Sequence, residues 1–430
     1  MTKPARTNSP WWWVPSLYYA EGLPYVVVMT VSVVMYKSLG ISNSAIAFYT
    51  SWLYLPWVLK PLWSPVVDVL STQRRWILLA QLLIGAAFAG VALTLPADNF
   101  FRYSLAVFWL LALSSATHDI AADGFYISQL DDHQQAWFVG IRSTFYRLAM
   151  ISGQGLLVVL AGFIGRTTDD PRLGWVVTFY LLAGLFVLLF AWHGRKLPAN
   201  NEAARLDAIS LRSLFREFAE TVISFFQKPH IVSALFFLLT YRFAEAQLVK
   251  LAPPFLLDER AAGGLGFDTT QVGIAYGTVG IVMLTLGGIL GGFLCARDGF
   301  RSWLWWMVAA INLPNAVYIL LACTQPQSQL LVNVAVGVEQ FGYGFGFTAY
   351  MLYMIYISRG EHSTAHFAIC TAFMALGMML PGMFSGELQE ALGYQWFFVW
   401  ILVATVPSFI AASLIRVDEN FGRKRPGAEA

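Results

Sequence analysis

Long apolar segments recur along nearly the whole chain and are separated by short polar connections. Many are close to the ~20 residues that an α-helix needs to cross a bilayer. The pattern predicts twelve membrane-spanning helices, at approximately 11–36, 43–66, 75–96, 102–129, 135–165, 173–194, 230–257, 270–296, 301–323, 329–358, 363–391 and 394–415. We therefore expect an all-α membrane protein whose two ends lie on the same side of the membrane.

The positions of lysine and arginine orient these spans. If the N-terminus is cytoplasmic, the cytoplasmic segments carry 17 basic residues and the outer segments carry 5. Cytoplasmic loops of membrane proteins are enriched in Lys and Arg. The sequence therefore predicts a multi-pass protein with both termini in the cytoplasm.

Composition agrees with a membrane protein and argues against an enzyme. The chain is 57% hydrophobic and 12% charged, against roughly 25% charged residues in soluble domains. Its three cysteines (Cys295, Cys323 and Cys370) have neither disulfide nor metal-ligand spacing. No nucleophile–base constellation or nucleotide-binding loop is visible. We expect no metal, no cofactor and no nucleic-acid partner.

The chain divides into two similar halves. Tyr19-Ala-Glu21 in the first span is echoed by Phe243-Ala-Glu245 in the seventh, about half the chain later. The loops after spans two and eight, 64–75 and 291–301, both resemble in degraded form a Gly-x-x-x-Asp-Arg signature. Two parallel six-helix repeats are the layout of major facilitator transporters, whose substrate site lies near the midplane between the halves.

One sustained polar stretch separates the halves. In residues 195–229, apolar side chains recur at helical spacing among charged ones, as in an amphipathic helix on a membrane surface or against the transport domain. The predicted organisation is a six-helix bundle at 1–194, a cytoplasmic linker at 195–229, a second bundle at 230–416 and a cytoplasmic tail at 417–430.

The most unusual segment is 114–126, which continues an apolar run and yet carries His118, Asp119 and Asp123. The two aspartates are four residues apart, so they lie on one face of a helix. A carboxylate at membrane depth costs at least roughly 2.5 kcal/mol. These acids therefore need cations, protons or a water-filled cavity, and they are our first candidates for proton coupling.

Other acids also fall on predicted spans. Glu21, Glu245 and Glu339 lie on spans one, seven and ten, which line the central cavity in the expected fold. Glu21 precedes Gly22-Leu-Pro24, and Glu339 precedes glycines where the helix can bend or pack closely. We interpret all three as further candidates for proton coupling.

Five basic residues lie in or beside the spans: Lys60, Arg142, Arg147, Arg242 and Lys250. Arg142 is placed to pair with Asp123 or Asp119 as a structural or gating lock. Arg147 lies deeper and suits an anionic ligand, because a guanidinium holds a carboxylate with two hydrogen bonds. A structural role tying cytoplasmic loops together is the interpretation for Asp68, Arg74, Arg75 and Asp298.

Aromatic residues are abundant, with 33 Phe, 18 Tyr and 16 Trp. Many belong to interface belts or face lipid. Those on expected cavity helices are candidates for stacking on a sugar, namely Tyr19, Tyr126, Tyr146 and Tyr343.

Two motifs resemble those of the AmpG-type muropeptide permeases, a family within the major facilitator superfamily, beside the acetyl-CoA transporters. Leu59-Lys60-Pro-Leu-Trp-Ser-Pro-Val-Val-Asp68 is similar to that family's Lys-Phe-Leu-Trp-Ala-Pro-x-x-Asp segment. Ser114-Ser-Ala-Thr-His-Asp119-Ile-Ala-Ala-Asp123 is similar to its Ser-x-Ala-Thr-Gln-Asp-Ile-Ala-x-Asp segment. His118 stands where the family usually has glutamine, and the chain has twelve predicted spans where the best-known permeases carry more.

The resemblance implies proton-driven import of peptidoglycan fragments, either anhydromuropeptides or the N-acetylglucosamine–anhydro-N-acetylmuramic acid disaccharide, across a bacterial inner membrane. Lys60, Asp119, Asp123 and Glu339 occupy matching motif positions, and Glu245 falls where the family often has an aspartate. The lactyl carboxylate of the substrate makes Arg147 or Arg242 a chemically coherent partner, with Lys60 as a further candidate contact.

Two other functions remain open from the sequence. The protein could carry another anionic compound, such as a siderophore, a drug or a CoA ester. It could also be a membrane sensor that binds muropeptides without carrying them. In each case the expected partners are a small molecule and the lipid bilayer, with a monomer as the default for this architecture.

Overall fold

The computed structural model describes residues 9–198, 211–360, 362–419 and 421–422, except for some side chains in α4, α7, α10 and α18. Every regular element among these residues is a helix. Each of the twelve predicted spans is occupied by helix, and nine stretches of the described chain are long and apolar enough to cross a membrane. One of them, 365–414, covers nearly all of the last two predicted spans. Gly393, with a positive φ of 72°, breaks α18 between these two spans.

The described chain separates into two compact units. The first, up to Val31 and from Leu59 to Phe218, contains η1 (Pro10–Trp12), α1 (Val14–Val26), η2 (Val27–Val31), most of α4 (Leu55–Leu70), α5 (Gln73–Thr94), α6 (Phe100–Gln129), α7 (Asp132–Ile151), η3 (Ser152–Leu157), α8 (Val158–Thr168) and α9 (Pro171–Lys196). Helix α10 (Leu211–Phe226) begins in this unit and ends in the second.

The second unit, Ser32–Val58 and from Ala219 onward, begins with α2 (Ser32–Ser38) and α3 (Asn43–Trp52). It continues with α11 (Ile231–Thr240), α12 (Phe243–Leu257), η5 (Arg260–Ala262), α13 (Thr269–Val272), η6 (Gly273–Gly280), α14 (Ile281–Asp298), α15 (Phe300–Asn312), η7 (Leu313–Asn315), α16 (Ala316–Thr324), α17 (Gln329–Ser358), α18 (Ser363–Val403) and α19 (Val406–Leu414).

The hairpin of α2 and α3 packs with the second unit, although the sequence places it in the first half of the chain. Helix α2 contacts α12, and α3 contacts α12 and α18. The chain is irregular where it enters and leaves this hairpin. The π-helix η2 ends at Val31, and a turn at Leu53–Tyr54 separates α3 from α4.

Short polar side chains cap the N-termini of several helices by accepting hydrogen bonds from the backbone of the first turn. The Asp131 carboxylate accepts a hydrogen bond from the Gln134 backbone, and the Gln134 side chain reciprocates. Asp268 and Gln271 repeat this capping box at α13. Each box satisfies two backbone donors that the first helical turn leaves without a partner.

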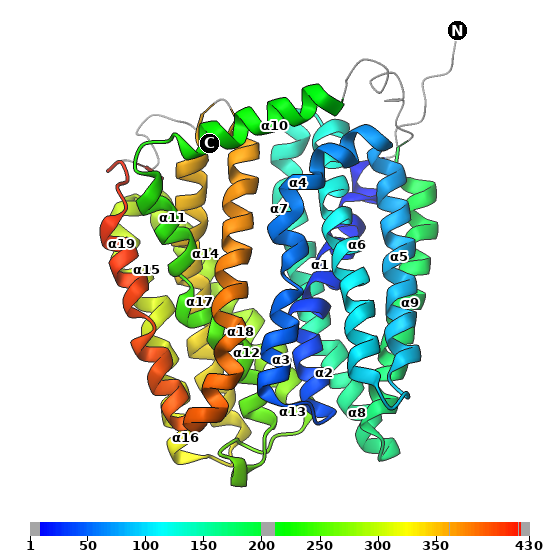
Figure 1. Ribbon diagram of the computed structural model, residues 1–430, viewed down its shortest axis with the longest axis vertical. Coiled ribbons are helices and arrows are strands. Elements are labelled where there is room, and N and C mark those ends of the chain that lie inside the picture. Colours follow the sequence, from blue (N-terminus) through cyan, green and yellow to red (C-terminus); the bar gives the residue numbers. More distant parts are fainter. Residues whose placement is uncertain (1–8, 199–210, 361, 420, 423–430) are drawn as a thin grey trace. The chain divides into compact units, whose positions relative to one another are not determined.

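Small residues and aromatic rings form the interior of each unit. In the first, α5 lies between α6 and α9 (Figure 1), and Phe88 packs edge-on against Phe186 at 5.4 Å. In the second, α17 is a continuous helix that contacts α14 and α15. A side chain at Gly344 would collide with the backbone of Leu284. The glycines after Glu339 therefore serve close helix packing.

Candidate functional site

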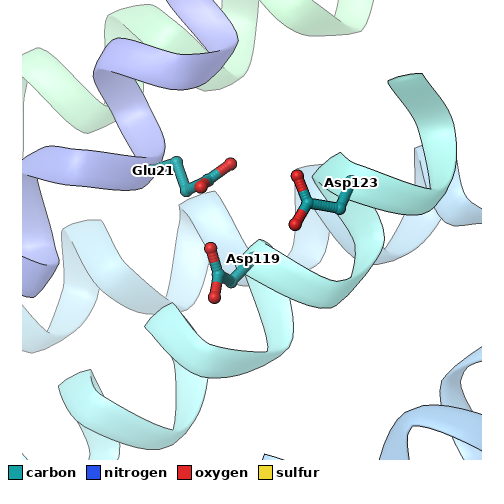
Figure 2. Close-up of side chains that lie close together, drawn as sticks. All are labelled: Glu21, Asp119 and Asp123. Atoms are coloured by element: carbon teal, nitrogen blue, oxygen red, sulfur yellow. The ribbon is translucent and has the colours of Figure 1, made fainter. Parts of the chain in front are cut away.

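Three acids of the first unit lie together. Glu21 comes from α1, and Asp119 and Asp123 come from successive turns of α6. One carboxylate oxygen of each lies within 4.8 Å of the others. Figure 2 shows the three side chains converging on one point. The four-residue spacing read from the sequence places both aspartates on the face of α6 that meets Glu21.

Two cations pair with two of these three acids. Lys60 Nζ lies 2.5 Å from Asp119 Oδ2, and Arg142 Nη2 lies 2.8 Å from Asp123 Oδ1. Glu21 has no ion pair among the described residues. Its side chain is 6% exposed, and its Oε2 has no hydrogen-bond partner. If all five groups were ionised, the cluster would carry one net negative charge.

Two tyrosines enclose the Arg142 guanidinium. It lies 4.4 Å from the ring centre of Tyr18 and 5.5 Å from that of Tyr126. The Tyr18 hydroxyl donates a hydrogen bond to Asp123 at 3.2 Å, and the Tyr126 hydroxyl donates one to the Gln135 carbonyl at 2.5 Å. In this structure Tyr126 is therefore engaged with Arg142 and the backbone.

The other candidates of the first unit have fewer polar contacts. Tyr146 packs beside Gly22, the neighbour of Glu21. Arg147 follows on α7, half-buried, and its Nη1 is buried without a hydrogen-bond partner. Tyr19 is half-buried on α1 and takes no part in the hydrogen bonds of the acid cluster among the described residues.

Three carboxylates at this spacing are also a donor set that suits a hard cation such as Mg²⁺ or Ca²⁺. Lys60 and Arg142, however, already neutralise two of the three acids. The remaining negative charge is one, which a single proton balances. The arrangement therefore fits a proton better than a divalent metal.

The second unit holds a different group of charges. Arg242, just before α12, donates a hydrogen bond of 2.5 Å to the Tyr343 hydroxyl, and its Nη2 lies 3.7 Å from Glu245 Oε1. The guanidinium also lies 5.0 Å from the centre of the Phe347 ring. Arg242 Nε and Glu245 Oε2 are buried without hydrogen-bond partners. The unused N–H group of Arg242 can therefore donate a hydrogen bond to another anion.

Glu339 of α17 is held by neutral groups. The Tyr318 hydroxyl donates to its Oε2 at 3.3 Å, and the Gln340 amide donates to the same oxygen at 3.0 Å. It has no cationic partner within ion-pair distance among the described residues. Its environment thus differs from that of Asp119 and Asp123.

The residues expected to tie loops together are only partly described. Arg74 donates a 2.6 Å hydrogen bond to the Gly194 carbonyl, whereas Arg75 is exposed. Asp298 pairs with Arg297 at 2.7 Å and accepts a hydrogen bond from Trp303. The side chain of Asp68 lies outside the described residues.

Sequence reasoning missed a polar network on the hairpin of α2 and α3. Lys37 pairs with Asp258 at 2.5 Å, and Asp258 also accepts a hydrogen bond of 2.5 Å from the Tyr394 hydroxyl. The Asn43 amide donates to Gln389 at 2.7 Å. The partners are more than 100 residues apart in the chain, so no local pattern reveals them.

Lys250 and His118 are not among the site residues that the sequence predicts. His118 is buried and shares a hydrogen bond of 3.0 Å with Gln81, which in turn contacts His193 at 2.8 Å. This interior network of the first unit is only partly satisfied, because His118 Nδ1 is buried without a hydrogen-bond partner. Lys250 is 1% exposed and donates to the Thr50 hydroxyl at 2.9 Å.

Comparison with known proteins adds the family and the fold. The BT1 family matches residues 21–338, about three quarters of the chain. The anhydromuropeptide permease of Escherichia coli K12 is 26% identical over 426 residues, with 94% of this chain and 81% of that protein covered. A putative transporter of Rickettsia conorii, named AmpG 4, is 23% identical and is covered over 95% of its length, with 93% of this chain.

Solved structures share the fold at low sequence identity. A mutant form of the nucleoside transporter NupG superposes with a TM-score of 0.70 at 14% identity, covering 94% of this chain and 99% of that one. A D-xylose–proton symporter gives 0.68 at 13% identity, covering 95% and 98%. The expected major facilitator fold is therefore confirmed. The relatives are transporters, so the chain belongs with multi-pass membrane transporters and not with enzymes.

Proposed function

Because the chain belongs to the BT1 family, we propose that it is a proton-coupled importer of peptidoglycan fragments in a bacterial cytoplasmic membrane. The substrate class is that named for the Escherichia coli relative, an anhydromuropeptide. Alternating access of two helical bundles, with both termini in the cytoplasm, is the transport mode that we infer. The observation that carries proton coupling is the cluster of Glu21, Asp119 and Asp123.

The pairing within the cluster points to Glu21 as the proton carrier. Lys60 is matched to Asp119 and Arg142 to Asp123, which leaves Glu21 as the acid without a cation of its own among the described residues. Adding a proton to Glu21 would cancel the net charge of the cluster. Releasing that proton would leave an uncompensated buried charge, which is unfavourable in a low-dielectric interior. Gain and loss of the Glu21 proton are therefore coupled to whether water reaches the acid cluster.

The other carboxylates have supporting positions in this proposal. Asp119 and Asp123 hold Lys60 and Arg142 near Glu21 and set the charge that the proton must balance. Glu245 and Glu339 are candidate proton sites of the second unit, because each is buried and neither makes a close ion pair. The Arg142–Asp123 pair, together with Arg74 and Asp298 at loop ends, is assigned to gating or structure.

The substrate side of the proposal rests on arginines with unused donors. Arg147 Nη1 and Arg242 Nε are both buried without hydrogen-bond partners. A guanidinium presents a planar fork that matches a carboxylate, so each is a candidate partner for an acidic sugar. The Tyr343 hydroxyl accepts a hydrogen bond from Arg242, which puts an aromatic ring beside that cation. Tyr146, the residue before Arg147 on α7, stays a candidate for stacking on a sugar.

The test is uptake of labelled N-acetylglucosamine–anhydro-N-acetylmuramic acid into vesicles that contain the purified protein. We expect accumulation above the outside concentration only when an inward proton gradient is imposed. In Glu21→Gln, gradient-driven accumulation should be lost, while exchange of labelled for unlabelled substrate should persist. An amide has nearly the size of the acid but cannot gain or release a proton near neutral pH.

Other outcomes select between the remaining functions. Binding of the disaccharide with no uptake by folded protein would indicate a sensor. Neither uptake nor binding, with uptake of another organic anion, would assign a different substrate. Full gradient-driven accumulation by Glu21→Gln would remove Glu21 from the coupling mechanism and leave the substrate assignment intact.

A further inference from the structure

Lys250 is a buried cation that no acid of the described residues neutralises. Its side chain on α12 is 1% exposed, and no carboxylate in the described part of the chain lies within ion-pair distance of it. Its polar contacts are a hydrogen bond to Thr50 Oγ1 at 2.9 Å and the Tyr54 ring, whose centre lies 5.2 Å from Nζ. Arg242, at the start of the same helix, has Glu245 beside it.

The surroundings of Lys250 are rich in donors. An ammonium has three N–H donors and no acceptor, and one of the three is used by Thr50. The Thr50 hydroxyl gives its own proton to the Ile46 carbonyl at 2.7 Å. Ser51 Oγ, on the same helix, is fully buried and has no hydrogen-bond partner.

Gly382 of α18 brings these groups together. A Cβ atom added at this glycine would lie 2.9 Å from Ser51 Oγ and 3.5 Å from the Cγ of Lys250. Both side chains therefore border the same glycine, which itself has no side chain to separate them. We call Lys250, Thr50, Ser51 and Gly382 the Lys250 site.

Charge and hydrogen bonding specify what would complete this site. A buried ammonium without a counter-ion is strongly unfavourable, and a neighbouring aromatic ring offsets only part of the cost. The unused donors are two N–H groups and one O–H. A ligand that satisfies them needs a negative charge and at least two acceptor oxygens, which describes a carboxylate.

We infer that the Lys250 site binds the carboxylate of the transported substrate. This position is distinct from Arg147 and Arg242. The inference rests on the proposed function only in taking that carboxylate from the substrate. Thr50 holds Lys250 in this structure and belongs to α3, which is tied to the rest of the second unit by Asn43 and, through α2, by Lys37. Breaking the hydrogen bond between Thr50 and Lys250 would free the ammonium, and the carboxylate then replaces the Thr50 hydroxyl while Ser51 stays beside Lys250.

The experiment compares two sugars, one of which carries an additional carboxylate group. N-acetylmuramic acid is N-acetylglucosamine with a lactyl ether, so the difference in binding between the two sugars reports on the lactyl group that carries the acid, and the Lys250 variants test the contribution of its charge. Binding to the purified full-length protein is measured by thermal shift across a concentration series. We expect the wild type to prefer N-acetylmuramic acid, and Lys250→Gln to lose that preference by about tenfold or more while retaining its affinity for N-acetylglucosamine.

Three further variants make the test specific. Lys250→Arg should keep part of the preference, because it keeps the charge, and Ser51→Ala should reduce it by a smaller factor than Lys250→Gln. Lys228→Gln is the matched control, since Lys228 lies between α10 and α11 and donates to the Arg359 carbonyl. Lys228→Gln should keep the wild-type preference for N-acetylmuramic acid over N-acetylglucosamine.

Two results would overturn the inference: equal binding of both sugars to the wild type, or an undiminished preference in Lys250→Gln. Failure of the proposed function looks different. A preference that depends on Lys250, in a protein that takes up no muropeptide, would keep the carboxylate site and reject peptidoglycan fragments as cargo. Muropeptide uptake together with an undiminished preference in Lys250→Gln would keep peptidoglycan fragments as cargo and reject the carboxylate site.

Discussion

The two units bury their charges in opposite ways. In the first, three acids meet two cations, and each cation has a close acidic partner at 2.5 Å or 2.8 Å. In the second, Arg242 has an acid at 3.7 Å and Lys250 has none within ion-pair distance among the described residues. The first cluster has an excess of acid, whereas in the second unit Arg242 and Lys250 equal Glu245 and Glu339 in number but form no close ion pair with them.

This difference separates two tasks that a coupled transporter must combine. A cluster with one surplus acid can gain or lose a proton and so change its net charge by one. Buried cations that lack a close acidic partner and keep unused N–H donors attract an anion. We therefore assign proton coupling mainly to the first unit and recognition of the carboxylate mainly to the second, with Arg147 as a first-unit contribution to binding.

The largest effect should come from breaking an ion pair of the acid cluster. Asp119→Asn leaves Lys60 without its acid, and removal of one partner from a buried pair costs about 3–5 kcal/mol when burial is complete. The pair here is about one-fifth exposed, so we expect a loss toward the lower end, together with loss of uphill uptake. Thermal unfolding and vesicle uptake measure the two effects.

The double variant Lys60→Gln/Asp119→Asn is the control for charge imbalance. It removes both partners, so stability should recover most of what the single variant loses, while uphill uptake should remain absent. A single variant as stable as the wild type would show that the Lys60–Asp119 pair contributes little to the first unit.

An intermediate effect is expected for Arg242→Lys in the second unit. Lysine keeps the charge but lacks the planar fork, so the contact with Tyr343 and the unused donor of Nε are lost. We expect KM for the acidic disaccharide to rise by roughly 10-fold to 100-fold, with a proton dependence like that of the wild type. Initial uptake rates across substrate concentration and external pH provide the measurement. A changed proton dependence with unchanged KM would reverse the assignment of tasks to the two units.

The smallest effect should follow Glu339→Gln. Glutamine retains a carbonyl oxygen that accepts the hydrogen bonds of Tyr318 and Gln340, and no cation loses a partner. We expect a change in unfolding free energy of about 1 kcal/mol or less. Uphill uptake should fall by less than in Glu21→Gln. A complete loss of uphill uptake with retained exchange would instead make Glu339 the principal proton site and weaken the comparison between the units.

Local patterns in the sequence were sufficient for the helices and for part of the acid cluster. The four-residue spacing of Asp119 and Asp123 fixes their common face on any helix. Each apolar segment that predicts a span is occupied by helix, and several of them are interrupted by a turn, for example at Leu53–Tyr54 and at Tyr241–Arg242. The glycines after Glu339 were expected to bend or to pack closely, and the structure shows close packing within an unbroken helix.

Long-range pairing could not be read in the same way. Glu21 joins two aspartates about 100 residues later, and Lys250 meets Thr50, 200 residues earlier. The assignment of Arg142 to Asp123 also needed the fold, since both aspartates were open as partners on sequence alone. Such contacts depend on how helices pack, which the periodicity of a single segment does not encode.

The sequence by itself determined that this is a multi-pass helical protein, because a bilayer requires long apolar segments whose backbone bonds are satisfied within each helix. It also marked the buried charges, since any ionisable residue in such a segment stands out. Only the tertiary structure decided which charges are matched and which are not. It left Glu21 without a cation of its own and Lys250 without an acid among the described residues, because pairing requires side chains from separate helices to come within a few ångströms.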